Sequence, residues 1–223
     1  MLKKALFVGG CTAPWHRIAG SAPYIEKALL DLGYAPEITG IFQVGNTDEH
    51  TGDYSSINAL KLAETDVLVL HTTGEAQGAN LEALKSWIKG GGALVAVHCA
   101  ADSFKDDAEW VSMLGGSFRH HPEQLDVTVE IVDATHPITQ DVTNFTVHEE
   151  LYCFNHYDPA NVHLLAETYS YDEGEGKPIP IAWTHEVELG RIFYLSLGHN
   201  PAVMETTQWQ TLFQNGVKWA TGQ

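Results

Sequence analysis

Residues 93–102 read ALVAVHCAAD, and this stretch decides the fold. The run ALVAV (93–97) is apolar at every position, which is typical of a strand buried on both faces of a parallel sheet. His98 and Cys99 follow without a turn residue, and the two alanines after them favour a helix. A strand that ends in reactive side chains and leads into a helix is expected where ligands bind to open α/β sheets.

The alternation of apolar strands with amphipathic helices extends toward the N-terminus. Strands are expected at residues 3–8, 35–40 and 66–71, and helices at 21–32 and 80–89. After about residue 122 the pattern changes, with strands expected at 127–131, 162–166, 179–183 and 192–195 before a closing helix at 207–220. The sequence therefore predicts an α/β fold that is doubly wound in its first half, with extra strands and a capping helix in its second.

Length, charge and cysteine content narrow the class of protein. The 223 residues contain no linker or internal repeat, so we expect a single domain over 1–223. A net charge of −17 disfavours nucleic acid and anionic membrane surfaces as partners. The three cysteines lack CxxC spacing, the start lacks a long apolar signal region, and no segment is apolar for a membrane-spanning length. We therefore expect a cytoplasmic protein, with a homodimer as the default oligomeric state.

Three of the expected strands end in small, polar or reactive residues. These ends are Gly9-Gly10-Cys11, His71-Thr72-Thr73 and His98-Cys99. Because the carboxyl ends of parallel strands meet at one edge of the sheet, we expect a ligand pocket to lie above that edge. A helix that starts near Ala100 would also point amide groups toward this pocket.

Several short motifs follow one another along the chain. They are GGALVAVHCAAD (91–102), LGGSF (114–118), HHP (120–122), THPIT (135–139), ELY (150–152), PIAW (180–183), GRIFY (190–194), LGH (197–199) and GVKWA (216–220). In this order they resemble the ThuA-like (trehalose utilisation) family. The resemblance runs from about residue 66 to the C-terminus, and before that only an early strand, a histidine at position 16 and a helix match.

The resemblance implies a flavodoxin-like sheet flanked by helices, similar to class I glutamine amidotransferases. Those enzymes carry a catalytic cysteine at the strand-to-helix turn, whereas His98 occupies this position here and in the family. Cys99 stands where the family has a small residue, and no Gly-x-Cys-x-Gly is present. Glutamine amidotransferase activity is therefore not expected, and the family points to carbohydrate catabolism instead.

Three residues are candidates for catalysis. His98 could act as a general base, as a metal ligand or as a buried structural histidine. Glu150 matches the recurrent acid of the family, and we expect it to point inward while Glu149 points to the surface, because neighbours in an extended chain point apart. His199 ends an apolar strand and is expected at the same edge as His98.

Other residues are candidates for substrate binding. Trp15 could stack on the apolar face of a sugar, and Asp102 could orient a histidine or simply open the helix. Cys99 could be a nucleophile, but a buried spacer is the favoured interpretation. The full set of substrate-binding candidates is Trp15, His16, Thr72, Thr73, Asp102, His121, Tyr152 and His185. The remaining singled-out histidines, His50, His136, His156 and His163, are expected to be structural or at the surface.

No cofactor follows from the sequence with certainty, but a divalent metal such as zinc is a candidate. Its candidate ligands are His98, His121, Glu150 and His199, which lack the close spacing of a metal motif and would have to converge through the fold. The favoured function is an enzyme, either a hydrolase, an isomerase or a lyase, that acts on a disaccharide, glycoside or keto-sugar. The alternatives are a non-catalytic sugar-binding or regulatory protein and a thiol-dependent hydrolase centred on Cys99.

Overall fold

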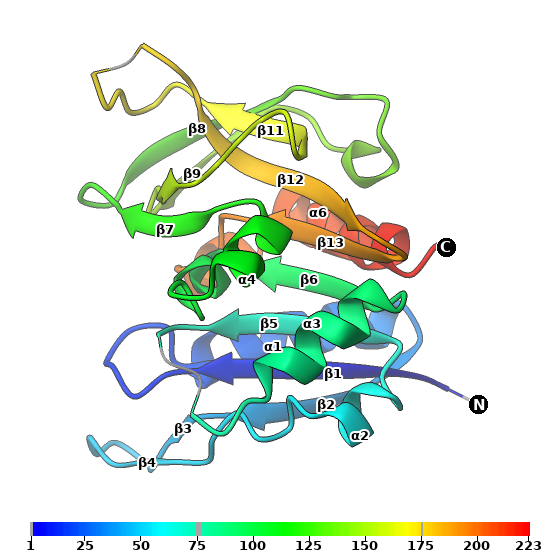
Figure 1. The fold of residues 1–223 in the computed structure, drawn as a ribbon. Coiled ribbons are helices and arrows are strands. Elements are labelled where there is room, and N and C mark those ends of the chain that lie inside the picture. The colour runs from blue at the N-terminus through cyan, green and yellow to red at the C-terminus, as the bar shows by residue number, and fades with distance from the viewer. Residues whose placement is uncertain (1, 75–76, 175) are drawn as a thin grey trace.

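The computed structural model describes residues 2–74, 77–174 and 176–223. Within them a nine-stranded sheet has the order β2-β1-β5-β6-β13-β12-β11-β8-β9 (Figure 1). Its first five strands pair in parallel: β2 (Tyr34–Gly40), β1 (Lys3–Gly10), β5 (Val67–Thr72), β6 (Ala93–Val97) and β13 (Gly190–Leu195). Every residue of β5 and β6 is buried, as their uninterrupted apolar sequences predicted.

The other part of the sheet is antiparallel. It continues from β13 through β12 (Ile179–Val187), β11 (His163–Thr168), β8 (Leu125–Ile131) and β9 (Phe145–Glu149). Each antiparallel step reverses the chain, so after an even number of steps β9 runs in the direction of β13. The carboxyl end of β9 therefore lies at the same edge of the sheet as the ends of the parallel strands.

Helices cover both faces of the sheet (Figure 1). On one face α1 (Ile18–Asp31) and α6 (Thr207–Ala220) bury Ile25, Trp209 and Phe213 in one apolar core. On the other face α3 (Leu81–Lys89) and α4 (Ala108–Leu114) bury Leu84 and Trp110 in a second core. The expected doubly wound α/β architecture is confirmed.

Short elements complete the fold. They are the hairpin of β3 (Phe42–Gln43) and β4 (His50–Thr51), the pair β7 (Ser117–His120) and β10 (Cys153–Asn155), α2 (Ala59–Leu62), α5 (Pro201–Met204) and the 3₁₀ helices η1 (His98–Asp102) and η2 (Pro137–Thr139). Over the part of the chain that the structure describes, no helix combines the length and the apolar character needed to cross a bilayer.

The segment after β6 differs from the sequence expectation. The chain does not enter an α-helix near Ala100 but forms the five-residue 3₁₀ helix η1, and α4 begins only at Ala108. The start of α4 is set by Asp107, whose carboxylate accepts a hydrogen bond from the backbone N–H of Trp110. The short strands β7, β9 and β10 were also not predicted, because segments this short carry little periodic signal.

Candidate functional site

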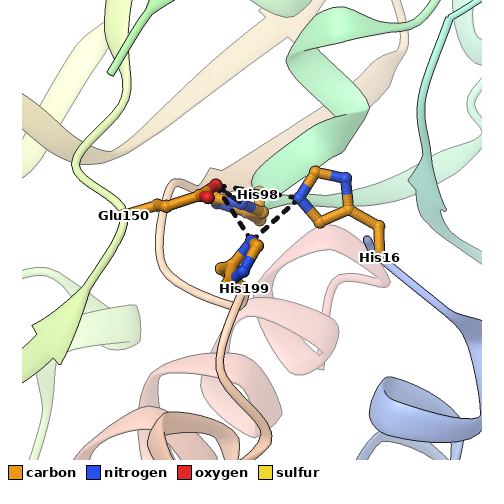
Figure 2. Close-up of side chains that lie close together, drawn as sticks. All are labelled: His16, His98, Glu150 and His199. Carbon is orange, nitrogen blue, oxygen red and sulfur yellow. Dashed lines mark hydrogen bonds and ion pairs between the residues drawn. The ribbon is translucent and has the colours of Figure 1, made fainter. Parts of the chain in front are cut away.

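Four side chains from distant parts of the chain meet at the carboxyl edge of the sheet (Figure 2). His16 lies between β1 and α1, His98 opens η1 after β6, and His199 follows β13. Glu150 follows β9, whose direction brings it to this edge. We call these four residues the histidine–glutamate cluster.

The polar atoms of the histidine–glutamate cluster converge on one small volume. Nδ1 of His199 lies 2.9 Å from Oε2 of Glu150 and 3.1 Å from Nε2 of His16. Nε2 of His98 lies 3.4 Å from the same Glu150 oxygen. The side chain of His98 is fully buried, while those of Glu150 and His199 are 12% and 18% exposed. The cluster is therefore reached from the side of Glu150 and His199.

The backbone at two of these histidines lies in the left-handed region, with φ of 53° at His16 and 44° at His98. This conformation costs a non-glycine residue about 1–3 kcal/mol and is retained where surrounding contacts enforce it. Gly198 has a φ of 143° and packs so closely that a Cβ atom would lie 2.9 Å from the side chain of Val97. The turns that carry the cluster are thus held in conformations that the chain does not prefer.

Glu149 supports the histidine–glutamate cluster without being a member of it. Its side chain is fully buried, contrary to the expectation that it faces solvent. Oε1 accepts hydrogen bonds of 2.6 Å from the backbone N–H groups of both Gly198 and His199, and Oε2 accepts one of 3.1 Å from that of Asn200. Burial raises the pKa of Glu149 to about 7, although these N–H groups favour the ionised form. Glu149 therefore ties the end of β9 to the turn that presents His199.

The strand pattern carried a signal for Glu149. In β9, Val147 and Glu149 are buried while Thr146 and His148 are exposed. Period-two alternation from Val147 places Glu149 on the inner face of the strand. The orientation of Glu150 follows from a different cause, since it lies just beyond the strand, where the chain turns.

Hydrogen bonding fixes the tautomer of His98. Its Nδ1 donates to the carbonyl oxygen of Ser196 at 2.7 Å, so Nδ1 carries the proton and a neutral ring presents a lone pair at Nε2. Burial lowers the pKa of His98 to about 4, and the nearby Glu150 only partly offsets this effect. Nε2 is buried without a hydrogen-bond partner among the described residues. At neutral pH the lone pair at Nε2 of His98 therefore faces the carboxylate of Glu150.

Glu150 and His199 influence each other in opposite directions. Burial alone would raise the pKa of Glu150, but the neighbouring imidazoles of His16, His199 and His98 outweigh it and hold the pKa far below its usual range. Burial would lower the pKa of His199, but the hydrogen bond to Glu150 and its charge raise it above the ordinary value. Glu150 therefore stays ionised, and it favours positive charge beside it.

Several predicted residues line the cluster. His121 places Nε2 3.6 Å from Oε1 of Glu150, and its side chain is 36% exposed. The ring of Tyr152 packs 4.0 Å from that of His98, measured between centroids. Thr73 Oγ1 lies 2.9 Å from Nδ1 of His16. His71 was absent from the candidate set, yet it is buried beside His16 and donates from Nε2 to the carbonyl of Gly198.

In the described part of the chain, no hydrogen bond or ion pair joins the other predicted residues to the histidine–glutamate cluster. His185 is in β12, where it pairs with Ile192 near the start of β13, so it lies at the opposite edge of the sheet. The expectation that His185 joins the pocket is wrong, because β12 is antiparallel to β13. Asp102 is bound to Lys105 at 2.6 Å, and Thr72 bonds to Ser103 inside the fold. Trp15 is 51% exposed.

Cys99 is fully buried. Burial raises the pKa of its thiol well above the ordinary value, so the group remains protonated at neutral pH. This geometry agrees with a buried spacer and removes the support for a nucleophile at this position.

Comparisons with known proteins agree with the architecture. Solved structures of ThuA-like proteins from Parabacteroides merdae and Bacteroides uniformis match with TM-scores of 0.75 each at 20% and 21% identity. The matches cover 99% and 98% of this chain and 90% and 91% of those chains. A GMP synthase protein from Thermoplasma acidophilum matches with a TM-score of 0.58 at 15% identity, over 100% of this chain and 96% of that one. At these identities the likeness concerns the fold, which is that of the glutamine amidotransferases.

A search of curated proteins found no match to this sequence. The family model described as ThuA, trehalose utilisation, matches residues 5–220, nearly the whole chain, including all four members of the histidine–glutamate cluster. The chain therefore belongs to the ThuA (trehalose utilisation) family.

Proposed function

We propose that the protein is a cytoplasmic enzyme of carbohydrate catabolism that uses the histidine–glutamate cluster, loaded with a divalent metal ion, as its catalytic centre. The observation that carries the proposal is the convergence of the four donor groups on one volume at the carboxyl edge of the sheet. Family membership supports a role in sugar metabolism, and a glycoside, a disaccharide or its keto derivative is the substrate class we favour. Nucleic acid and membranes are not proposed as partners, because the net charge is −17.

The donor set fits a metal ion of the zinc type. Imidazole nitrogen and carboxylate oxygen bind zinc at about 2.0–2.2 Å, so neighbouring donors of one tetrahedron lie about 3.3–3.5 Å apart. The distances from the imidazole nitrogens to the nearer oxygen of Glu150 run from 2.9 Å for His199 to 3.9 Å for His16, and all four donor atoms lie within 4.8 Å of one another. The lone pair of His98 that lacks a partner is the second indication, because a cation between Nε2 and Glu150 would satisfy both groups.

The surrounding residues resemble the outer partners of a metal site. Ligating histidines commonly donate their second ring N–H to a carbonyl or another acceptor, which fixes the ring. His98 donates to the Ser196 carbonyl in this way, and His16 contacts Thr73 through its second nitrogen. Glu149 holds the turn that carries His199. The chain thus supports the donors before any ion binds.

Each part of the cluster then has a chemical task. A divalent ion bound here supplies a Lewis acid that polarises a carbonyl or hydroxyl oxygen of a sugar. His16, His98, Glu150 and His199 would hold it, while His121 lies at the exposed side within reach of Glu150. An imidazole in this position can move a proton to or from the substrate. Hydrolysis, isomerisation and elimination on a sugar all use this combination.

Metal analysis of untagged protein tests the proposal. The wild type and a Glu150→Gln variant are compared by elemental analysis, with Glu123→Gln as the control because Glu123 is an exposed loop residue. We expect Glu150→Gln to lose one metal equivalent per chain and Glu123→Gln to keep it. Equal metal content in all three proteins would refute the metal centre.

Turnover is tested in parallel on a panel of disaccharides and their keto derivatives. We expect product with the metal-loaded wild type and none with Glu150→Gln. Tight sugar binding by isothermal titration without product from any compound would instead indicate a non-catalytic sugar-binding protein.

A further inference from the structure

A second group of donor side chains lies near the histidine–glutamate cluster but faces away from it. His120, Cys153 and Glu173 each place one ligand atom within 4.8 Å of the other two. Nε2 of His120 lies 3.2 Å from Oε1 of Glu173. The Cys153 side chain is buried, while Glu173 and His120 are partly exposed. We call these three residues the thiol cluster.

Strand pairing brings two of the three residues together. His120 ends β7 and Cys153 starts β10, and the two residues are direct partners in this antiparallel pair. Partners of this kind project their side chains to the same face. Glu173 comes from the loop between β11 and β12 and closes the group.

The alternation of an extended chain separates the thiol cluster from the histidine–glutamate cluster. His121 faces Glu150 whereas its neighbour His120 faces Glu173. Tyr152 packs on His98 whereas its neighbour Cys153 belongs to the thiol cluster. In each of these two consecutive pairs, one residue therefore contacts the histidine–glutamate cluster and the other belongs to the thiol cluster, which keeps the donor sets distinct.

We propose that the thiol cluster is a second metal site, for a zinc-type ion bound by the Cys153 thiolate, the His120 imidazole and the Glu173 carboxylate. Zinc binds cysteine sulfur, histidine nitrogen and carboxylate oxygen, at about 2.3 Å for sulfur and 2.0–2.2 Å for the others, which sets donor separations of about 3.3–3.6 Å. The His120–Glu173 distance of 3.2 Å is close to this spacing, and all three donor atoms lie within 4.8 Å of one another. Binding forms the sulfur–metal bond, and the thiol proton leaves to solvent.

Two further contacts favour this site. Arg119 forms an ion pair with Oε2 of Glu173, which leaves Oε1 directed at His120. Ligating carboxylates are commonly held by such outer partners. Arg119, Cys153 and Glu173 also line a cavity of about 440 Å³, which has room for water or a small ligand as the fourth donor.

Cobalt(II) is the probe, because thiolate ligation to cobalt gives a near-ultraviolet charge-transfer band that imidazole and carboxylate ligation do not. Reduced, untagged, chelator-treated full-length protein is titrated with cobalt(II) alone. We expect the band to appear and to saturate in the wild type. Cys153→Ser should abolish it, and His120→Ala should weaken cobalt binding at this site by at least about tenfold.

Two matched variants identify the source of the band. Cys99→Ser removes another buried thiol and should leave the band unchanged. His98→Ala removes a donor of the histidine–glutamate cluster and should also leave it unchanged, so that failure of the proposed catalytic centre would not be mistaken for failure of this site. Circular dichroism verifies that each variant is folded. Absence of the band in the wild type, or its persistence in Cys153→Ser, would overturn the proposal.

Discussion

Two groups of histidines occupy opposite edges of the same sheet. His16, His98 and His199 surround Glu150 at the carboxyl ends of the parallel strands, with side chains no more than 18% exposed. His136, His163 and His185 lie at the other edge, around a cavity of about 470 Å³. We call this second group the opposite-edge histidines.

The opposite-edge histidines each have a separate, ordinary partner. His163 is paired with Asp133 at 2.8 Å and is 54% exposed, and His185 donates to the carbonyl of Met113. His136 accepts from the N–H of Ile138. In contrast, His98 has a buried nitrogen with no hydrogen-bond partner among the described residues. A high histidine content is therefore uninformative by itself, whereas imidazoles that share one carboxylate and leave one lone pair unsatisfied indicate a site.

The largest expected difference between the two groups is in metal binding. His98→Ala should weaken zinc binding at the histidine–glutamate cluster by at least about 100-fold, because it removes a ligand rather than an outer partner. His163→Ala should leave zinc binding unchanged. Competition against a chromogenic chelator measures both, with Cys153→Ser as the background so that the thiol cluster does not contribute. Equal zinc affinities of His98→Ala and His163→Ala would contradict the assignment of the metal site to the histidine–glutamate cluster.

The next largest effect is expected on stability, from the loss of the hydrogen bonds that Glu149 accepts. Glu149→Ala leaves the buried N–H group of Gly198 and the partly buried N–H groups of His199 and Asn200 without their acceptor, and should lower the free energy of unfolding by about 3 kcal/mol. Glu123→Ala, at an exposed loop position, should change it by less than about 0.5 kcal/mol. Urea denaturation compares the two. A loss as small as that of the control would show that Glu149 does not hold the turn.

His98 makes one defined contribution to the pH dependence of stability in the metal-free protein. The unfolded chain protonates this residue near 6.5 and the folded chain only near 4, so between these values the unfolded state binds more protons. The contribution of His98 to stability therefore rises by about 3 kcal/mol as pH increases from about 4 to 6.5. His98→Asn keeps a donor for the Ser196 carbonyl and should flatten this rise. An unchanged profile in denaturant titrations would mean that His98 titrates normally.

The smallest effect is expected at the opposite edge. His163→Ala removes an exposed ion pair with Asp133 and should change the free energy of unfolding by only about 0.2–1 kcal/mol. Denaturation in low and high salt measures it, and salt should reduce the difference. A loss comparable to that of Glu149→Ala would mean that the two edges differ less than their contacts indicate.

Most of the parallel half of the fold was predictable from sequence. Uninterrupted apolar runs such as 66–71 and 93–97 coincide with β5 (Val67–Thr72) and β6 (Ala93–Val97), and the closing helix was predicted with its observed bounds. The edge strand β9 was not found, because its alternation of polar and apolar residues covers only five residues. The direction of the antiparallel strands could not be predicted from the sequence, which is why His185 was assigned to the wrong edge of the sheet.

The sequence alone determined the residue types of the site. They are histidines at strand ends, an acid before an aromatic residue, and a histidine directly after the strand at the strand-to-helix turn. Which of these residues meet was decided by the tertiary structure alone. Local periodicity reports which face of its own element a side chain occupies, but it contains no information on strand order or on the number of reversals between β13 and β9. That order brings Glu150 to the imidazoles of His16, His98 and His199 and keeps it away from the opposite-edge histidines, because the direction of a strand determines at which edge of the sheet its last residue lies.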